Sequence, residues 1–208
     1  MASLREKQKA QRRNLIEVAA GELFVEKGFD DTTIEVIAER ALVSPATVYN
    51  YYGSKGELLL ALVARGEVGI KEKLDGFVAL ADTAKPADLL TDVIMSNVDD
   101  TLSALSRELW GHVVAFIATT PDPTVAPKYL DTIVDGLAKA IEKVLAHFVT
   151  EGVFKPDTDC HYVAYLFTRI ERIHFLTYIY LDDFSRDELR AAIEKDVAFI
   201  LDGIRVKL

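Results

Sequence analysis

The sequence has few of the residues that define several large classes of protein. A single cysteine, Cys160, stands among 208 residues, which excludes an internal disulfide framework and a metal site built from several thiolates. Only six prolines occur and no low-complexity run is found, so a largely disordered chain is excluded as well. Half of the residues are hydrophobic, which is enough to bury a substantial core.

Long apolar runs are also missing. The longest, residues 58–64, is far shorter than the roughly 18 residues that a membrane-spanning helix needs. Basic residues follow Met1, but no apolar signal-peptide core comes after them. We therefore expect a cytoplasmic protein without a membrane partner.

The charge is unevenly distributed along the chain. The formal net charge is −9, yet residues 1–55 hold eight basic and eight acidic residues, so the remainder accounts for all of it. Within residues 1–14, five basic residues stand against Glu6 alone. The amino-terminal part is thus compatible with phosphate, whereas the acidic remainder would repel it. A solvated basic tail would give the same pattern, so charge alone does not decide the function.

Helical periodicity dominates the sequence, and no convincing pair of strands is found. Caps, glycines and prolines divide the chain into about nine helices. These are expected over residues 6–27, 32–41, 45–52, 54–80, 85–106, 107–119, 124–150, 157–181 and 185–205. The predicted fold is therefore all-α, with one domain over residues 1–53, extending to about 65, and a second over 54–208.

Residues 33–52 are predicted to form two short helices joined by three or four residues, the pattern of a helix-turn-helix. The first helix starts at Thr32 or Thr33, and a cap at Thr32 would let Glu35 complete a capping box. The apolar wedge that two such helices share is supplied by Ile34, Ile37, Ala38, Val43 and Val48.

The second helix of this motif begins with Ser44 as cap and Pro45 in its first turn. Its outer side is formed by Pro45, Ala46, Thr47, Tyr49, Asn50 and Tyr51. Such a helix fits the major groove of DNA, where its amino-terminal half meets the base edges. The Thr47 hydroxyl and the Asn50 amide can bond to bases or phosphate, and Lys55 adds positive charge at the next helix start.

The first 65 or so residues resemble the DNA-binding domain of the TetR family, the tetracycline-repressor-like regulators. The matching residues are Ala20 to Gly28-Phe29, Thr32-Thr33, Ile37-Ala38, Val43-Ser44, Thr47 to Tyr52, and Ser54 to Leu59. The resemblance implies phosphate contacts at Thr33, Ser44, Tyr51 and Lys55, and a base-contacting face at Pro45, Ala46, Thr47, Tyr49 and Asn50. One position departs from the pattern: Leu42 stands where the family commonly has glycine. If the turn needs a positive φ there, leucine adds roughly 1 kcal/mol of strain.

For the whole chain, the resemblance implies a ligand-responsive regulator of transcription. It would be a repressor that binds a palindromic operator in double-stranded DNA as a homodimer and is released by a small-molecule effector, with no cofactor and no metal. The helix over 157–181 is apolar all round, so one face can pack on its own domain and the other on a partner chain. Candidate effector-binding residues are Trp110, Phe116, Arg169, His174 and Tyr178, although a lone His or Arg on such a helix is more often structural.

Three alternatives compete with this interpretation. An aromatic core stripe is disfavoured because residues 49–52 occupy every face of their helix, and only Tyr52 is expected in the core. An enzyme is disfavoured because no zinc, nucleophile-elbow, phosphate-loop or dinucleotide motif is found, and the adjacent Cys160 and His161 point about 100° apart in a helix. A non-specific architectural DNA binder is disfavoured by the acidic remainder of the chain.

Overall fold

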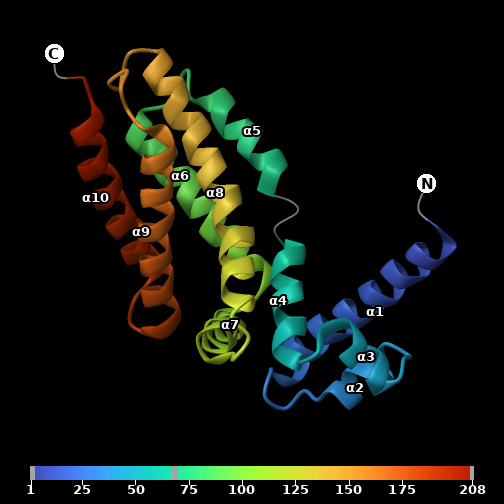
Figure 1. Cartoon of the computed structure of the whole chain (residues 1–208). Coiled ribbons are helices and arrows are strands. Elements are labelled where there is room, and N and C mark those ends of the chain that lie inside the picture. The colour runs from blue at the N-terminus through green and yellow to red at the C-terminus, as the bar shows by residue number, and fades with distance from the viewer. Residues whose placement is uncertain (1–2, 67–69, 207–208) are drawn as a thin grey trace. The chain divides into compact units, whose positions relative to one another are not determined.

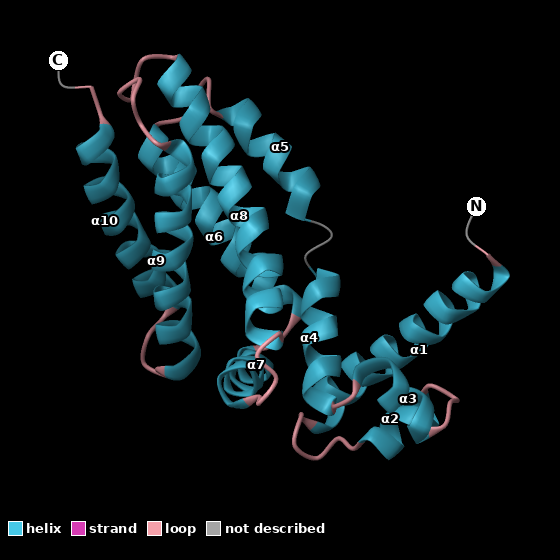
Figure 2. Cartoon of the chain, in the orientation of Figure 1, coloured by secondary structure: helices cyan, strands magenta, loops and turns pink. Residues whose placement is uncertain are grey.

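Helices form all of the regular structure that is described for this chain. The computed structural model describes residues 3–66 and 70–206, and within these ranges it holds ten helices and no strand (Figure 1, Figure 2). The helices are α1 (Leu4–Lys27), α2 (Ile34–Arg40), α3 (Pro45–Tyr52), α4 (Lys55–Gly66), α5 (Ile70–Leu80), α6 (Pro86–Ala104), α7 (Arg107–Thr119), α8 (Val125–Thr150), α9 (Cys160–Tyr180) and α10 (Arg186–Ile204). The predicted all-α fold class is confirmed. None of the described helices combines the length and apolar character that crossing a membrane requires.

Two details differ from the sequence-based expectation. The helix predicted over 54–80 is described as α4 and α5, and residues 67–69 between them lie outside the described residues. The capping box predicted for a start at Thr32 is wrong, because Thr33 is the cap of α2 and accepts from the backbone N–H of Val36. Thr32 is instead fully buried, and its hydroxyl donates to the carbonyls of Leu23 and Gly28.

The chain divides into two compact units, each formed from two stretches. The amino-terminal unit comprises Met1–Gly66 and Ala104–Val125, and the carboxy-terminal unit comprises Glu67–Ser103 and Ala126–Leu208. Helix α7 therefore belongs to the amino-terminal unit. The functional division predicted at residues 53–65 stays a prediction, because compactness alone does not test function.

The amino-terminal unit has an apolar core formed by one stripe from each of its helices. Its buried side chains include Ile16, Ala19, Ala20, Leu23 and Phe24 of α1, Ile34, Ile37 and Ala38 of α2, Val48 and Tyr52 of α3, Leu58, Leu59 and Val63 of α4, and Leu109, Trp110 and Val113 of α7. Gly28 ends α1 with a φ of 81°, a conformation that glycine adopts at little steric cost. This packing holds the short helices α2 and α3, which could not persist alone.

In the carboxy-terminal unit α9 packs against α10, and many side chains of α6 are buried. An isolated antiparallel bridge between Phe154 and Arg205 joins the loop after α8 to the end of α10. The unit also buries Thr91 and Asn97 of α6 and Thr168 and Glu171 of α9. Burying polar groups is costly unless they are hydrogen-bonded, so these residues distinguish this core from a purely apolar one.

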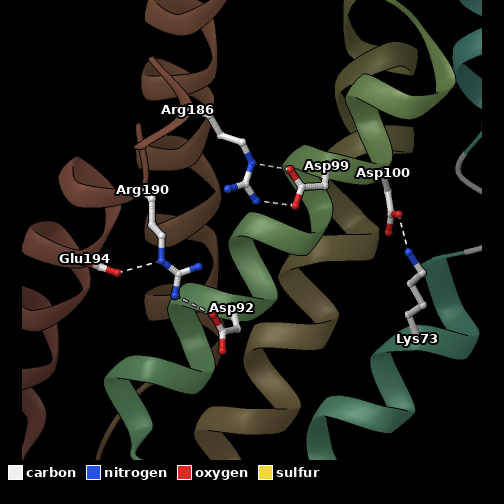
Figure 3. A network of polar contacts seen from close by, with 7 residues as sticks. All are labelled: Lys73, Asp92, Asp99, Asp100, Arg186, Arg190 and Glu194. Carbon is white, nitrogen blue, oxygen red and sulfur yellow. Dashed lines mark hydrogen bonds and ion pairs between the residues drawn. The ribbon is translucent and has the colours of Figure 1, made fainter. Parts of the chain in front are cut away.

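Ion pairs tie α6 to its neighbours within the carboxy-terminal unit (Figure 3). Arg186 of α10 donates to both carboxylate oxygens of Asp99, at 2.9 and 2.6 Å, and Arg190 donates to Asp92 at 2.7 Å. On another side of α6, Lys73 of α5 pairs with Asp100. These side chains are partly exposed, so the pairs contribute little stability each and chiefly fix the register of α10 on α6.

Candidate nucleic-acid interface

Three backbone hydrogen bonds hold the turn between α2 and α3. The backbone N–H groups of Ala41, Leu42 and Val43 donate to the carbonyls of Ile37, Glu39 and Ala38, respectively. Leu42 has a φ of 55° and is 93% exposed. The turn therefore does need a positive φ where the family commonly has glycine, and the leucine side chain gains no packing in return for its strain.

The start of α3 is set by Ser44 and Pro45. The Ser44 hydroxyl accepts from the backbone N–H of Thr47 at 3.2 Å, and Pro45 occupies the first turn, where its missing N–H is not needed. The two hydroxyls of Ser44 and Thr47 lie 2.9 Å apart. Together they present a compact pair of hydroxyl groups at the exposed amino-terminal end of α3.

Helix α3 has a buried side and an outer side, as its sequence predicts. Val48 is fully buried and Tyr52 packs in the core, whereas Tyr49 is 49% exposed. The remaining predicted DNA-contacting residues on this helix are all accessible: Pro45, Ala46 and Asn50 are exposed, and Thr47 and Tyr51 are half-buried. Thr33 and Ser44, the two helix caps, are also exposed. The surface of α3 therefore offers hydroxyl, amide and aromatic groups together.

Tyr52 anchors the carboxy-terminal end of α3 to α1. Its hydroxyl donates to the Glu17 carboxylate at 2.9 Å, and the Arg13 guanidinium lies 5.7 Å from the ring centroid. Glu17 also pairs with Arg65 of α4 at 3.6 Å. Burial, followed by the Glu17 hydrogen bond, raises the pKa of Tyr52, so the phenol remains a donor. These contacts hold the end of α3 against α1, and the Glu17–Arg65 pair ties α1 to α4.

Lys55 has a structural role that the sequence did not reveal. Its ammonium group donates to the carbonyls of Phe29 at 2.6 Å, Thr32 at 2.9 Å and Asp30 at 3.3 Å, and lies 4.2 Å from the Phe29 ring centroid. The side chain thus closes the loop between α1 and α2. Twenty-six residues separate Lys55 from Phe29, so no local pattern in the sequence marks this contact. Its role as a phosphate contact stays a prediction.

Helix α7 packs closely on the same loop and on α4. The His112 ring stacks on Phe29 with centroids 4.7 Å apart. A Cβ atom placed on Gly56 would lie only 2.3 Å from a ring carbon of Phe116, far inside van der Waals contact. Only glycine at this position lets the Phe116 ring approach the first turn of α4 so closely.

The five predicted effector-binding residues are divided between the two units. Trp110 is buried in the amino-terminal unit, where Phe116 packs against Gly56. In the carboxy-terminal unit, Arg169 is exposed and Tyr178 is half-buried. The His174 ring is hydrogen-bonded to Asp196 of α10 at 2.6 Å. Their shared role in binding a ligand stays a prediction.

Cys160 and His161 do not form a nucleophile and base. Burial, reinforced by Glu142 and Asp159, raises the pKa of the Cys160 thiol, which keeps it protonated. The His161 ring pairs instead with Glu142 at 3.2 Å. Across the part of the chain that the structure describes, no group of three or more His, Cys, Asp or Glu side chains could hold a metal ion.

Comparison with known proteins gives close matches in the amino-terminal region. The model for bacterial regulatory proteins of the tetR family matches residues 16–62. YdeS of Bacillus subtilis strain 168, an uncharacterized HTH-type transcriptional regulator, is 48% identical over 42 residues, which are 20% of this chain and 21% of that protein. The HTH-type transcriptional activator FasR of Mycolicibacterium smegmatis is 40% identical over 55 residues, 26% of this chain and 25% of that protein. The matches thus span a quarter or less of these curated relatives.

The fold likeness extends over most of the chain. The crystal structure of Thermus thermophilus FadR, a TetR-family transcriptional repressor in complex with lauroyl-CoA, has a TM-score of 0.73 and 24% identity, covering 94% of this chain and 96% of that one. At this level of identity the likeness concerns the fold. The resemblance predicted from the sequence is confirmed: residues 16–62 match the model for bacterial regulatory proteins of the tetR family, and the fold over most of the chain is that of a TetR-family structure.

Proposed function

We propose that this protein is a ligand-responsive, sequence-specific transcriptional repressor that binds a palindromic operator as a homodimer. The family whose model matches residues 16–62 is one of bacterial regulatory proteins, which supports a regulator rather than an enzyme. The observation that supports operator binding most directly is the outer side of α3, where hydroxyl, amide and aromatic groups stand exposed on a helix locked by Val48 and Tyr52. A helix of this size fits the major groove. The expected cytoplasmic location is part of this proposal.

The proposed contacts fall into two groups. Thr33, Ser44, Tyr51 and Lys55 bind phosphates, and Pro45, Ala46, Thr47, Tyr49 and Asn50 face the bases. Phosphate contacts position the protein on the duplex, whereas base contacts distinguish sequences. The acidic balance of the whole chain disfavours an architectural binder, which would depend on a broad positive surface.

Selection from a random duplex library tests DNA recognition. The parent protein should enrich one near-palindromic sequence, and Tyr49→Ala should reduce discrimination between that duplex and a scrambled one by roughly 1–3 kcal/mol. Tyr49→Phe is the matched control for the hydroxyl group, since it keeps the ring. Enrichment of no sequence, with uniform binding to all duplexes, would favour the architectural alternative.

Helices α9 and α10 are the proposed dimer interface. They leave large apolar side chains exposed on the single chain, with Ile173 at 63% and Phe199 at 83%. Both lie within three residues of the His174–Asp196 hydrogen bond that joins the two helices. A second copy packed two-fold on this face would remove them from water.

Sedimentation tests this interface. Phe199→Asp should give a folded monomer that no longer binds the operator tightly, because each half-operator would then be bound independently. Val25→Asp, at another exposed apolar residue (79% exposed) on α1, should remain dimeric. A Phe199→Asp variant that sediments as a dimer would exclude this face.

The proposed effector is a small molecule, and Trp110, Phe116, Arg169, His174 and Tyr178 are the proposed responsive residues. Fatty acyl-coenzyme A is the first class to test, because Thermus thermophilus FadR, which shares the fold, holds lauroyl-CoA. For a roughly 100-fold loss of operator affinity, the ligand must prefer the non-binding state by about 2.7 kcal/mol. Calorimetry should then show the operator duplex weakening ligand binding by the same factor. One similar protein, FasR, is named an activator, so repression has to be distinguished from activation. Transcription in vitro makes this distinction.

A further inference from the structure

The first three turns of α1 extend beyond the packed core of the amino-terminal unit. Every residue from position 3 to position 15 is exposed, and the first buried side chain of the helix is Ile16. At 1.5 Å per residue, this exposed part of α1 is about 18 Å long. Tertiary packing therefore does not explain why this segment is helical.

Local interactions account for the helix instead. The Ser3 hydroxyl accepts from the Glu6 N–H at 3.2 Å, and the Glu6 carboxylate accepts from the Ser3 N–H at 2.6 Å, which completes a capping box. Lys, Gln, Arg and Ala, which dominate the following turns, are good helix formers. The segment thus begins at a defined residue and has a defined shape.

The basic residues of this segment lie in line with the buried stripe of the same helix. Arg5, Lys9 and Arg12 are spaced by four and three residues, and a further four residues lead to Ile16. Residues at this spacing share one face of a helix, and Lys7 falls on the opposite face. One face of α1 therefore changes from cationic to apolar at the point where the helix meets the core.

The exposed segment is held firmly at its base. Arg13 donates to Glu17 at 3.1 Å and lies over the ring of Tyr52, the last residue of α3. Among the described residues, none forms an ion pair with Arg5, Lys9 or Arg12. These three cations are thus available to a partner, and the Arg13–Tyr52 contact ties the base of their helix to α3.

We propose that Arg5, Lys9 and Arg12, the α1 stripe, bind the phosphate backbone of duplex DNA that flanks the segment contacted by α3. The inference rests on the proposed function and deepens it. Charge complementarity supports DNA, because the stripe is cationic on a chain whose formal net charge is −9. The Arg13–Tyr52 contact ties the base of this helix to α3, which supports DNA that flanks the α3 segment in particular. A length of about 18 Å matches roughly five nucleotides at 3.4 Å each.

An anionic membrane is the less suitable partner for the α1 stripe. Helices that lie on membranes have a broad apolar face opposite their basic residues. The exposed segment has Leu4 and Leu15 as its large apolar residues, and they are separated by three turns. The exposed segment therefore lacks a continuous apolar face that could enter lipid.

The test compares the triple variant Arg5→Gln/Lys9→Gln/Arg12→Gln with the parent on a duplex selected from a random 40-base-pair library. Removing one cation that binds a phosphate should lower the slope of log affinity against log salt by about 0.9, so the triple variant should lower it by roughly 2.7 for each protomer bound. At 0.15 M salt this corresponds to an affinity decrease on the order of 100-fold for each protomer bound. Lys7→Gln, on the opposite face, is the matched control and should leave the slope unchanged.

The selected sequence and the length of the duplex sharpen the test. The triple variant should enrich the same sequence as the parent, because phosphate contacts do not distinguish bases. Removing the flanking base pairs should weaken the parent and leave the triple variant unaffected. A triple variant with the parent's slope and affinity would overturn the inference while leaving the proposed function intact. Failure of the parent to enrich any duplex would instead overturn the proposed function, and binding of the parent to anionic vesicles through these residues would also count against the inference.

Discussion

The two compact units differ in what they bury. Among the described residues, the amino-terminal unit buries one polar side chain, Thr32, whose hydroxyl donates to two backbone carbonyls. The carboxy-terminal unit buries four polar side chains: Thr91, Asn97, Thr168 and Glu171. A buried carboxylic acid lowers stability relative to an apolar side chain of similar volume. The first core is thus almost wholly apolar, whereas the second keeps four polar side chains on its helices.

This difference parallels the extent of the sequence likeness. The family model matches residues 16–62, all within the amino-terminal unit. The four buried polar side chains of the carboxy-terminal unit all lie outside the matched residues.

The tightest packing of the amino-terminal unit gives the largest expected effect. Gly56→Val should lower the free energy of unfolding by about 3 kcal/mol, because its side chain would overlap the Phe116 ring. Gly111→Val, in a position of α7 with open space around it, should change stability by less than about 0.5 kcal/mol. Urea unfolding measures both. Adding Phe116→Ala to Gly56→Val should recover part of the stability, and no recovery would mean that the ring is not the obstacle.

The carboxy-terminal unit should differ by responding to pH through Glu171. Burial raises the pKa of Glu171 to about 6, from an ordinary value of 4.5, although Arg172 and an Asn97 hydrogen bond oppose the shift. Because the folded-state pKa is the higher one, the stability contributed by Glu171 is fully present below pH 4.5 and is lost as the pH rises through 6.

Glu171→Gln should therefore remove this part of the pH dependence and be more stable than the parent at pH 7.5 by about 2 kcal/mol. The glutamine amide can still bond to Asn97. The exposed Glu151→Gln is the matched control and should follow the parent at every pH. Parallel unfolding curves for the parent and Glu171→Gln between pH 4.5 and 7.5 would show that the buried carboxyl group does not titrate in this range.

The smallest expected effect is at Leu42, where the amino-terminal unit departs from the pattern of the tetR family. Leu42→Asn should raise the free energy of unfolding by roughly 0.5–1 kcal/mol, because asparagine tolerates a positive φ better than leucine does. The exposed leucine side chain contributes no packing that the substitution would remove. Leu42→Val, with a β-branched side chain, should instead lower stability, and thermal unfolding distinguishes the two.

The sequence predicted the amino-terminal unit in detail because its signals are local. Ser44 and Pro45 start α3, Gly28 ends α1, and Val48 alternates with exposed neighbours at helical spacing. Even the strain at Leu42 followed from its position in the turn. Choosing between Thr32 and Thr33 as the cap of α2 required tertiary contacts, since Thr32 bonds to carbonyls of α1 and the following loop.

The contacts that the sequence could not predict join residues far apart in the chain. Lys55 bonds to the loop at Phe29, Arg186 to Asp99 87 residues away, and Phe116 packs on Gly56. The hydrophobic periodicity of a single helix carries no information about such distant pairs. For the same reason, the predicted effector residues were chosen by type alone, and the structure divides them between the two units.

The assignment of α7 to the amino-terminal unit has a consequence for protein engineering. Residues 104–125 form one compact unit with residues 1–66, whereas residues 67–103 belong to the other unit. A chimera could join the proposed DNA-binding domain to the sensor of another regulator by a single cut after α4. Such a cut would leave Phe29 and Gly56 without His112 and Phe116. We expect functional exchange of sensors to require transplanting two segments of the chain together.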